Sequence, residues 1–445
     1  MTCAFTHTVA AGGGDREDIP PIGKKQIRMK TIAILATGSR GDVQPFLALA
    51  VGLMRRGHEV RFVCNAIHAD LSLAFGLETR RVTWDPRPSM RLQATLAKEK
   101  NPFQYIRGQM ENTRSIYDLA QQESFEACQD IDMLIFSVLS PWGYSIAERS
   151  GIPCMAGMIH PLERTHEFPM QMIPANLGGG LNWLSHLLAE QLFQLLSGGE
   201  INKFRRRLGL PAQRFPSTLF GILRRRDIPL LCNLSPTVMA RPQDWSERIH
   251  MHGYWFLPAP PGWKPSPRLT AFLAAGEPPV YIGFGSMVTG EALRTSRMID
   301  EALAAVGLRG LLYEGWGGLT EAGFRKGRIL TVGEMPHDWL FEQVSAVIHH
   351  GGAGTTASAL RAGIPQVVVA HMQDQPYWGR KMHAIGVSPP PLNSARISAE
   401  AIEKTLRTIH EDKTMQERAR VIGGCIRAEQ GLEKTLSVIE TYFNL

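Results

Sequence analysis

The sequence predicts an α/β protein with two similar halves, each a doubly wound parallel sheet. Short apolar runs bounded by glycine alternate with stretches of helical length, which is the pattern of parallel strands joined by crossover helices. One such series begins at Met29 and another at residue 278. The chain has 445 residues, a length that suits two domains of about 200 residues each.

The first half is expected over residues 29–240. It opens with the apolar run TIAILATG, which predicts a buried parallel strand, followed by the loop SRGDVQP and the helical stretch FLALAVGLMRRGH. The runs EVRFVCN, DMLIFSV and PCMAGMI predict further strands of this sheet. Residues 1–28 have no helical or strand period and no apolar signal-peptide core, so we interpret them as a flexible N-terminal extension.

Residues 170–226 interrupt this alternation as a variable insertion. They contain the apolar helical stretch NWLSHLLAEQLFQLL, followed by the basic stretches KFRRRLGLP and LRRR. An apolar helix of this spacing usually belongs to a core, with the arginines in solvent. The alternative is an apolar binding pocket that sits against an anionic membrane surface.

The second half is expected over residues 269–415, after a linker at 241–268 that is rich in proline and aromatic residues. The runs PPVYIGFGSM, RGLLYEGWGG, RILTVGEMP, SAVIHH and PQVVVA predict its strands. We expect residues 416–445 to form a C-terminal helix that packs back on the first domain. Ligands of such sheets bind at the carboxyl ends of the strands.

Composition narrows the class of protein. The formal net charge of +7 is compatible with an anionic ligand, and no motif for nucleic acid is present. The six cysteines are scattered without a CxxC pair, which favours a reducing cytoplasm over a disulfide framework. No apolar run has the roughly 18 residues of a membrane-spanning helix. We expect a cytoplasmic monomer.

Residues 349–356, HHGGAGTT, lie at the end of one predicted strand, with a helix expected from Thr355 or Thr356. Glycines let backbone N–H groups approach an anion, and the helix N-terminus adds a favourable dipole. With the ring of His350 and the threonine hydroxyls, this stretch is typical of a diphosphate site. The alternative is an ordinary turn with a capping threonine. A zinc site is disfavoured because adjacent strand residues point to opposite faces.

The next predicted strand ends in HMQDQPYWG. Its carboxylate and amide, Asp374 and Gln375, suit hydrogen bonds with neighbouring sugar hydroxyls. Standing alone, such a pair would more often be a solvated loop.

The combined run HHGGAGTTASALRAGIPQVVVAHMQDQPYWGRKMHAIGV resembles the donor-binding signature of the UDP-glycosyltransferase family, whose GT-B fold has two Rossmann-like domains facing a cleft. The sequence of this run is most similar to those of sterol glucosyltransferases and glycopeptide-antibiotic glycosyltransferases. The run GSRGDVQPFLALAVGLMRRGHEVRF is similar to the opening of those enzymes. The resemblance therefore spans both halves but not residues 170–226.

The resemblance implies a donor site in the second half. Asp374 and Gln375 match the pair that holds the transferred sugar. Ser286, in GFGSM, matches a phosphate-binding serine, although it also suits a helix cap. The nucleobase would lie near Met335 and an aromatic surface on Trp316, and the UDP assignment rests on the resemblance alone. The implied diphosphate-binding residues of this half are Ser286, His350, Gly352, Gly354 and Thr355.

The resemblance also implies a catalytic base in the first half. Plant relatives use a histidine in the first loop, but this loop holds none, and Asp42 matches the aspartate of the antibiotic and sterol enzymes. An apolar surrounding would raise the pKa of this carboxyl and improve it as a base. The alternative role of Asp42 is a helix cap. Ser39 and Arg40 are expected to reach the diphosphate, and a structural ion pair is an equal alternative for Arg40.

The expected activity is that of an inverting hexosyltransferase that needs neither metal nor cofactor, since the UDP-sugar is a co-substrate. It would move a hexose, glucose by resemblance, to a hydroxyl of a hydrophobic acceptor such as a sterol or a polyketide-like aglycone, with at most weak peripheral membrane contact. The alternatives are a non-catalytic nucleotide-sugar-binding protein and a UDP-sugar epimerase. TGSRGD is not GxGxxG, so a dehydrogenase is disfavoured.

Overall fold

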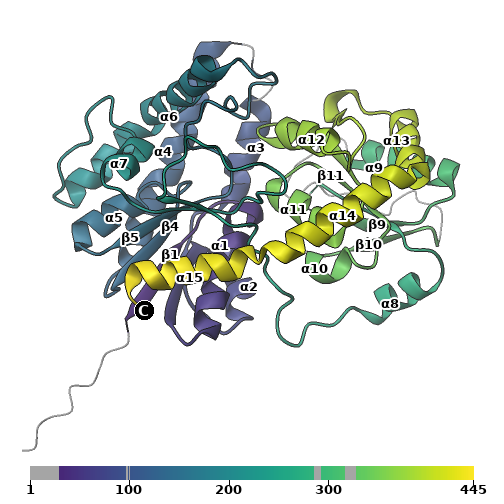
Figure 1. The fold of residues 1–445 in the computed structure, drawn as a ribbon, viewed down its shortest axis with the longest axis horizontal. Helices are drawn as coiled ribbons and strands as arrows, with labels where there is room; N and C mark the ends of the chain where they lie inside the picture. Colours follow the sequence, from purple (N-terminus) through teal and green to yellow (C-terminus); the bar gives the residue numbers. More distant parts are fainter. Residues whose placement is uncertain (1–29, 97–98, 100, 285–291, 316–326) are drawn as a thin grey trace, which may run out of the picture.

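The computed structural model describes residues 30–96, 99, 101–284, 292–315 and 327–445 (Figure 1). They form two α/β domains that lie side by side, each with one parallel sheet between layers of helices. The predicted fold class is confirmed. Residues 1–28, expected as a flexible extension, lie outside the described residues.

The first domain has a seven-stranded parallel sheet in the order β3-β2-β1-β4-β5-β6-β7 within the described residues. Its strands are β1 (Thr31–Leu35), β2 (Glu59–Asn65), β3 (Glu78–Val82), β4 (Met133–Ser137), β5 (Cys154–Met158), β6 (Leu230–Cys232) and β7 (Ile249–Met251). Its helices are α1 (Arg40–Arg55), α2 (Ala69–Leu73), α3 (Pro86–Leu96), α4 (Pro102–Ala127), α5 (Gly143–Ser150), α6 (Gly179–Arg207) and α7 (Leu219–Arg225).

The second domain has a six-stranded sheet in the order β10-β9-β8-β11-β12-β13 within the part of the chain that is described. Its strands are β8 (Val280–Gly283), β9 (Gly310–Tyr313), β10 (Ile329–Val332), β11 (Ala346–His349), β12 (Gln366–Ala370) and β13 (Leu392–Asn393). Its helices are α8 (Pro267–Ala274), α9 (Ala292–Val306), α10 (His337–Leu340), α11 (Ala353–Ala362), α12 (Gln375–Ala384), α13 (Ala399–Glu411) and α14 (Lys413–Glu429). Helix α15 (Gly431–Phe443) completes the chain.

Strand β1 shows why the apolar runs become central strands. All five of its residues are buried, because helices cover both faces of the sheet. Ala33 and Leu35 point into one apolar cluster, while Ile32 and Ile34 point into the other. This central strand leads straight into the loop that carries Asp42.

The expected linker at 241–268 contains a strand that sequence reasoning missed. Ile249–Met251 pairs with β6 and closes the edge of the first sheet. Its three residues are too few to show a period of two, which is why the sequence pattern did not reveal it.

The C-terminal segment consists of two helices, not the single helix expected over 416–445. Gln430, in a left-handed conformation (φ 53°), ends α14, and α15 begins at the next residue. The yellow helices of Figure 1 show the result, because α14 lies along the second domain and α15 along the first. Helix α14 packs on α11, and α15 packs on α1. Arg56, the C-cap residue of α1, forms ion pairs of 2.5 Å with Glu433 and 2.6 Å with Glu440 of α15.

Helix α6 has an inverted distribution of polarity. The side chains that it buries are mainly polar, namely Asn182, Ser185, His186, Glu190 and Ser197. One row of its leucines is exposed, and we call this row the α6 leucine face: Leu181, Leu184, Leu188, Leu192 and Leu195. The α6 leucine face therefore neither packs into a core nor lines the cavity between the two domains, as the two sequence-based alternatives required, although Leu208, Leu219 and Leu223, later in 170–226, are buried in the core of the first domain. The stretch is also not a span, because no helix in the described part of the chain is long and apolar enough to cross a membrane.

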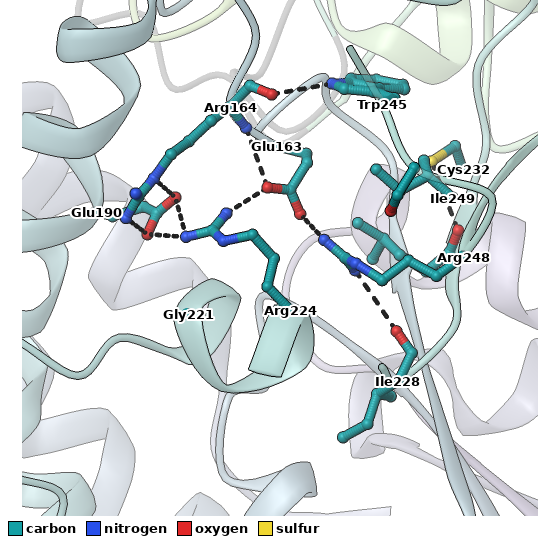
Figure 2. A network of polar contacts seen from close by, with 12 residues as sticks. Glu163, Arg164, Glu190, Gly221, Arg224, Ile228, Cys232, Trp245, Arg248 and Ile249 are labelled. Carbon is teal, nitrogen blue, oxygen red and sulfur yellow. Dashed lines mark hydrogen bonds and ion pairs between the residues drawn. The ribbon is translucent and has the colours of Figure 1, made fainter. Parts of the chain in front are cut away.

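A buried ion network explains why the polar side of α6 faces inward (Figure 2). Glu163 lies between the guanidinium groups of Arg224 and Arg248 and pairs with both. Glu190 of α6 accepts two hydrogen bonds of 2.7 Å from Arg164 and is also reached by Arg224. Buried charges are tolerated when they are paired in this way. The network fixes α6 and α7 to the loop after β5.

Candidate functional site

A cavity of about 700 Å³ lies between the two domains, at the carboxyl ends of their central strands. Of the described residues that line it, none comes from 170–226. Ten of the residues predicted from the sequence line this one cavity: Ser39, Arg40, Asp42, Met335, His350, Gly352, Gly354, Thr355, Asp374 and Gln375. Ser286 and Trp316, also predicted, lie outside the described residues.

The turn between β11 and α11 forms one wall. Gly351 has a φ of +90°, and a Cβ added there would lie 2.7 Å from Val368 Cγ1, so only glycine fits. The helix begins at Ala353, earlier than expected, with Gly352 as its N-cap. Thr356 is turned away, because its hydroxyl donates to the Gly352 carbonyl at 2.9 Å. The N-terminal turn of α11, with Gly354 and Thr355, therefore faces the cavity.

The two adjacent histidines have different environments. His349 is fully buried, with Nε2 2.8 Å from Gln366 Oε1 and Nδ1 accepting from the Gly351 N–H, which makes it a structural residue. His350 lines the cavity, and its Nδ1 is buried without a hydrogen-bond partner among the described residues. Burial, with His349 and His371 nearby, lowers the pKa of His350 to about 3. The His350 ring is therefore neutral near pH 7.

Asp374 and Gln375 lie at the start of α12. Asp374 Oδ2 accepts a hydrogen bond of 2.9 Å from the indole N–H of Trp378. Gln375 Oε1 accepts from the backbone N–H groups of His371 and Met372, at 2.8 and 3.1 Å. Gln375 thus shapes the loop before α12, while Trp378 fixes the orientation of the Asp374 carboxylate.

Asp42 lies in the first turn of α1 and forms a capping box. Its Oδ2 accepts from the Ser39 N–H at 2.7 Å and from the Ser39 hydroxyl at 2.8 Å. A Cβ on Gly38 (φ +132°) would lie 2.6 Å from that oxygen, so the carboxylate needs glycine behind it. Burial raises the pKa of Asp42 despite these hydrogen bonds. Asp42 therefore caps α1, as the helix-cap alternative expected, and also lines the cavity.

Arg40 bridges the two domains. Its guanidinium forms an ion pair of 2.8 Å with Glu334 of the second domain and a hydrogen bond of 2.9 Å with Gln44. This is the ion-pair alternative that the sequence left open. The neighbouring Met335 also lines the cavity.

Two features of the cavity were missed from the sequence. His160 stands two residues after β5, and its Nδ1 lies 3.4 Å from Asp374 Oδ2 of the other domain. A histidine at the carboxyl end of a predicted strand was the available signal, but no motif contains it. The second feature is an apolar wall on the first-domain side, made by Ile67, Trp84, Met90, Ile116, Ile159 and Phe256.

Comparison with known proteins finds a matching family model in each half of the chain. Residues 32–169 match the family model "Glycosyltransferase family 28 N-terminal domain", and residues 326–429 match "Erythromycin biosynthesis protein CIII-like, C-terminal domain". The fold matches the glycosyltransferase of kitacinnamycin with a TM-score of 0.68 at 20% identity, covering 93% of this chain and 99% of that one. The chain has the GT-B fold of these glycosyltransferases. CalG4, the calicheamicin glycosyltransferase, has a TM-score of 0.67 at 17% identity, covering 94% and 99%.

Curated relatives of this GT-B chain include sterol 3-beta-glucosyltransferases. The protein of Pichia angusta is 32% identical over 439 residues, which cover 95% of this chain and 34% of that protein. The protein of Neurospora crassa is 33% identical over 429 residues, covering 92% and 27%. The chain thus spans about a third of the length of the curated relatives that it matches.

Proposed function

We propose that this chain is an inverting, metal-independent hexosyltransferase that moves glucose from UDP-glucose to a hydroxyl of a hydrophobic acceptor, such as a sterol or a polyketide-like aglycone. The observation that carries this proposal is that Asp42 of one domain and Asp374 of the other line the same cavity, beside the N-terminus of α11. A reaction between two bound molecules needs such a meeting point.

The donor would bind to the second domain. The backbone N–H groups at the start of α11, with Gly354 and Thr355, suit the diphosphate, and the helix dipole favours its charge. The His350 ring lies beside them. Asp374 suits the sugar hydroxyls, since Trp378 already orients its carboxylate. The uracil would lie toward Met335.

The chemistry would be a single displacement. The acceptor oxygen attacks the anomeric carbon, the bond from that carbon to the diphosphate oxygen breaks, and Asp42 takes the proton of the acceptor hydroxyl. The raised pKa of Asp42 makes it a stronger base than an exposed carboxylate. The α11 N-terminus stabilises the charge that develops on the leaving UDP.

The acceptor assignment rests on the apolar wall of the first domain and on the sterol glucosyltransferase relatives. Trp84, Met90 and Ile116 present aromatic and aliphatic surface that suits a fused-ring aglycone better than a sugar. The hydroxyl to be glycosylated would then point toward Asp42.

Incubation with UDP-glucose and a panel of sterols, polyketide aglycones and hydrophilic alcohols tests the function. We expect a glycoside by mass spectrometry with the apolar acceptors, and inverted stereochemistry at the anomeric carbon by NMR. Binding of UDP-glucose without any product would favour a non-catalytic binding protein, and conversion of the sugar without an acceptor would favour an epimerase. Faster transfer from dTDP-glucose would correct the nucleotide.

We also propose a cytoplasmic, monomeric protein whose α6 leucine face touches anionic membranes weakly. Leu188 and Leu195 of this face are 60% and 67% exposed. Phe215, 80% exposed, lies in a loop held beside α6 by the hydrogen bond from Gln191 Nε2 to the Pro216 carbonyl. A row of exposed leucines along one helix face is typical of a contact surface.

Charge favours a lipid surface as the occupant. Arg214 and Arg225 are exposed on either side of the Phe215 loop, and Arg225 donates to Ser217 within that loop. The acidic residue of α6 closest to the leucine face, Glu190, is turned inward and paired. Apolar side chains flanked by arginines suit anionic headgroups.

Vesicle flotation tests this contact. We expect binding to vesicles of 30% phosphatidylserine, weaker binding to phosphatidylcholine alone, and loss of binding in a Leu188→Gln, Leu192→Gln double variant. Leu73→Gln, which alters an equally exposed leucine on α2, is the matched control. Absence of flotation with a doubled mass in solution would assign the face to a second copy of the chain instead.

A further inference from the structure

His160 crosses the cleft from the first domain to the second. It stands two residues after β5, its side chain is 18% exposed, and its Nδ1 lies 3.4 Å from Asp374 Oδ2. That nitrogen is buried and has no hydrogen-bond partner among the described residues. A buried ring nitrogen aimed at a carboxylate, and slightly too far for a good hydrogen bond, is placed for a contact that a small closure of the cleft would shorten.

Asp42 is the other charged neighbour of this histidine. The charge of His160 lowers the pKa of Asp42, while the charge of Asp374 raises it, although burial has the larger effect. The cavity therefore holds two carboxylates from opposite domains, with one imidazole close enough to act on both. Two like charges in one site disfavour each other, and a positive ring beside them offsets that cost.

We propose that His160 is a positioning residue that couples the two carboxylates across the closed cleft. Its Nδ1–H donates to Asp374 Oδ2, which leaves Asp374 Oδ1 directed at the sugar hydroxyls. Its charge, when the ring is protonated, keeps Asp42 ionised beside Asp374. This inference rests on the proposed transferase function.

The two parts of the role have separable consequences. Loss of the N–H donor loosens Asp374 and weakens recognition of the sugar. Loss of the charge removes an influence that lowers the pKa of Asp42. Two other influences raise the pKa of Asp42, namely burial and the charge of Asp374. The hydrogen bonds from Ser39 lower it. Because Asp42 must be ionised to act as a base, the acid limb of the pH profile then moves to higher pH.

The experiment compares His160→Leu and His160→Asn with the wild type. In the leucine variant we expect KM for UDP-glucose to rise about tenfold, the acid limb of kcat/KM to move to higher pH, and the Kd of UDP to change less than twofold. Asparagine places an N–H close to the position of Nδ1 but carries no charge. We therefore expect His160→Asn to restore KM while the acid limb stays displaced, a split that a packing role would not produce.

His166→Gln is the matched control, because His166 belongs to the same connection but pairs with Asp244 outside the cavity. Thermal unfolding of each variant shows whether the fold is kept. An unchanged KM and an unchanged acid limb in a folded, active His160→Leu variant would overturn the inference. Absence of transfer in the wild type would instead overturn the proposed function, so the two failures are distinguishable.

Discussion

At the scale of single residues, Asp42 combines two roles in one carboxylate. Its Oδ2 is occupied by the Ser39 N–H and hydroxyl, which fixes the plane of the group. The hydrogen bonds that cap α1 therefore also orient the proposed base, because fixing Oδ2 fixes the direction in which Oδ1 points. A base held in this way loses little entropy when the acceptor arrives.

Replacement of Asp42 by asparagine separates the two roles. Asparagine retains an oxygen for the Ser39 donors but cannot take a proton, so we expect kcat to fall about 10²- to 10⁴-fold with the fold intact. The dissociation constant for UDP-glucose, measured by calorimetry, should stay within a few-fold of the wild type. Unchanged turnover would remove Asp42 as the base.

Ser39→Ala is the companion variant. It removes one hydrogen bond that lowers the pKa of Asp42, so the pKa should rise further. We expect the acid limb of kcat/KM to move to higher pH without loss of the plateau rate. If the acid limb moves in Ser39→Ala and is absent in Asp42→Asn, the limb reports the ionisation of the Asp42 carboxylate.

His350 and Asp374 are predicted to serve different parts of the donor. His350→Ala should weaken binding of UDP itself by about tenfold or more, since a hydrogen bond to a charged group is lost. Asp374→Ala should leave UDP binding nearly unchanged and raise KM for UDP-glucose. Calorimetry with UDP and with UDP-glucose separates the two, and equal losses of UDP affinity would contradict this division.

At the scale of elements, the buried Glu163 network is expected to be sensitive to substitution. Glu163→Ala leaves Arg224 and Arg248 without their shared partner in a buried site. Breaking a buried pair in this way costs about 3–5 kcal/mol, so we expect a clear loss of stability in chemical denaturation. Glu111→Ala, which alters an exposed pair on α4, should change stability by less than about 0.5 kcal/mol.

The elements also show what the sequence could and could not predict. Central strands such as β1 were predictable because they are apolar on both faces. The turn before α11 was predictable because a glycine-rich stretch with threonines follows an apolar run and precedes a helical stretch. Helix α6 was not, because the periodicity of its leucines indicates a helix but not which side faces inward. Its orientation depends on Glu163 and Arg224, residues far apart in sequence.

The site was predictable to a similar degree. Residues within a recognisable motif, such as Asp42 and His350, were predicted from the sequence, and they line one cavity. His160 did not, because its importance lies in a contact with Asp374, 214 positions away and in the other domain. The start of α11 was placed two or three residues late, because its N-cap is Gly352, which has no capping side chain.

At the scale of the whole molecule, the described residues cross between the domains twice, and the two crossings touch. Gly253 of the first crossing lies against Gly431 of the second, where a Cβ added to Gly431 would be 2.4 Å from the Gly253 carbonyl carbon. The indole N–H of Trp255 donates to Thr435 Oγ1 at 3.0 Å beside this contact. The two connections between the domains therefore pack against each other at this point.

Gly431→Ala should disturb this point. The added methyl group must push the two crossings apart, so we expect a lower Tm and a higher KM for the acceptor, because the cleft no longer closes to the same geometry. Gly424→Ala, in the middle of α14 with nothing within 4 Å of the new Cβ, is the control. It should leave activity unchanged and stabilise slightly, as alanine does inside helices.

The return of α15 to the first domain has a consequence for protein engineering. A chimera that replaces the second domain by a single cut would also replace the helix that packs on α1 and pairs with Arg56. Two junctions are needed, one near Gly253 and one at Gln430, so that residues 431–445 stay with the half they stabilise. Built this way, a graft exchanges the proposed donor site as a cassette inserted into the first domain, with its two ends already adjacent at the Gly253–Gly431 contact.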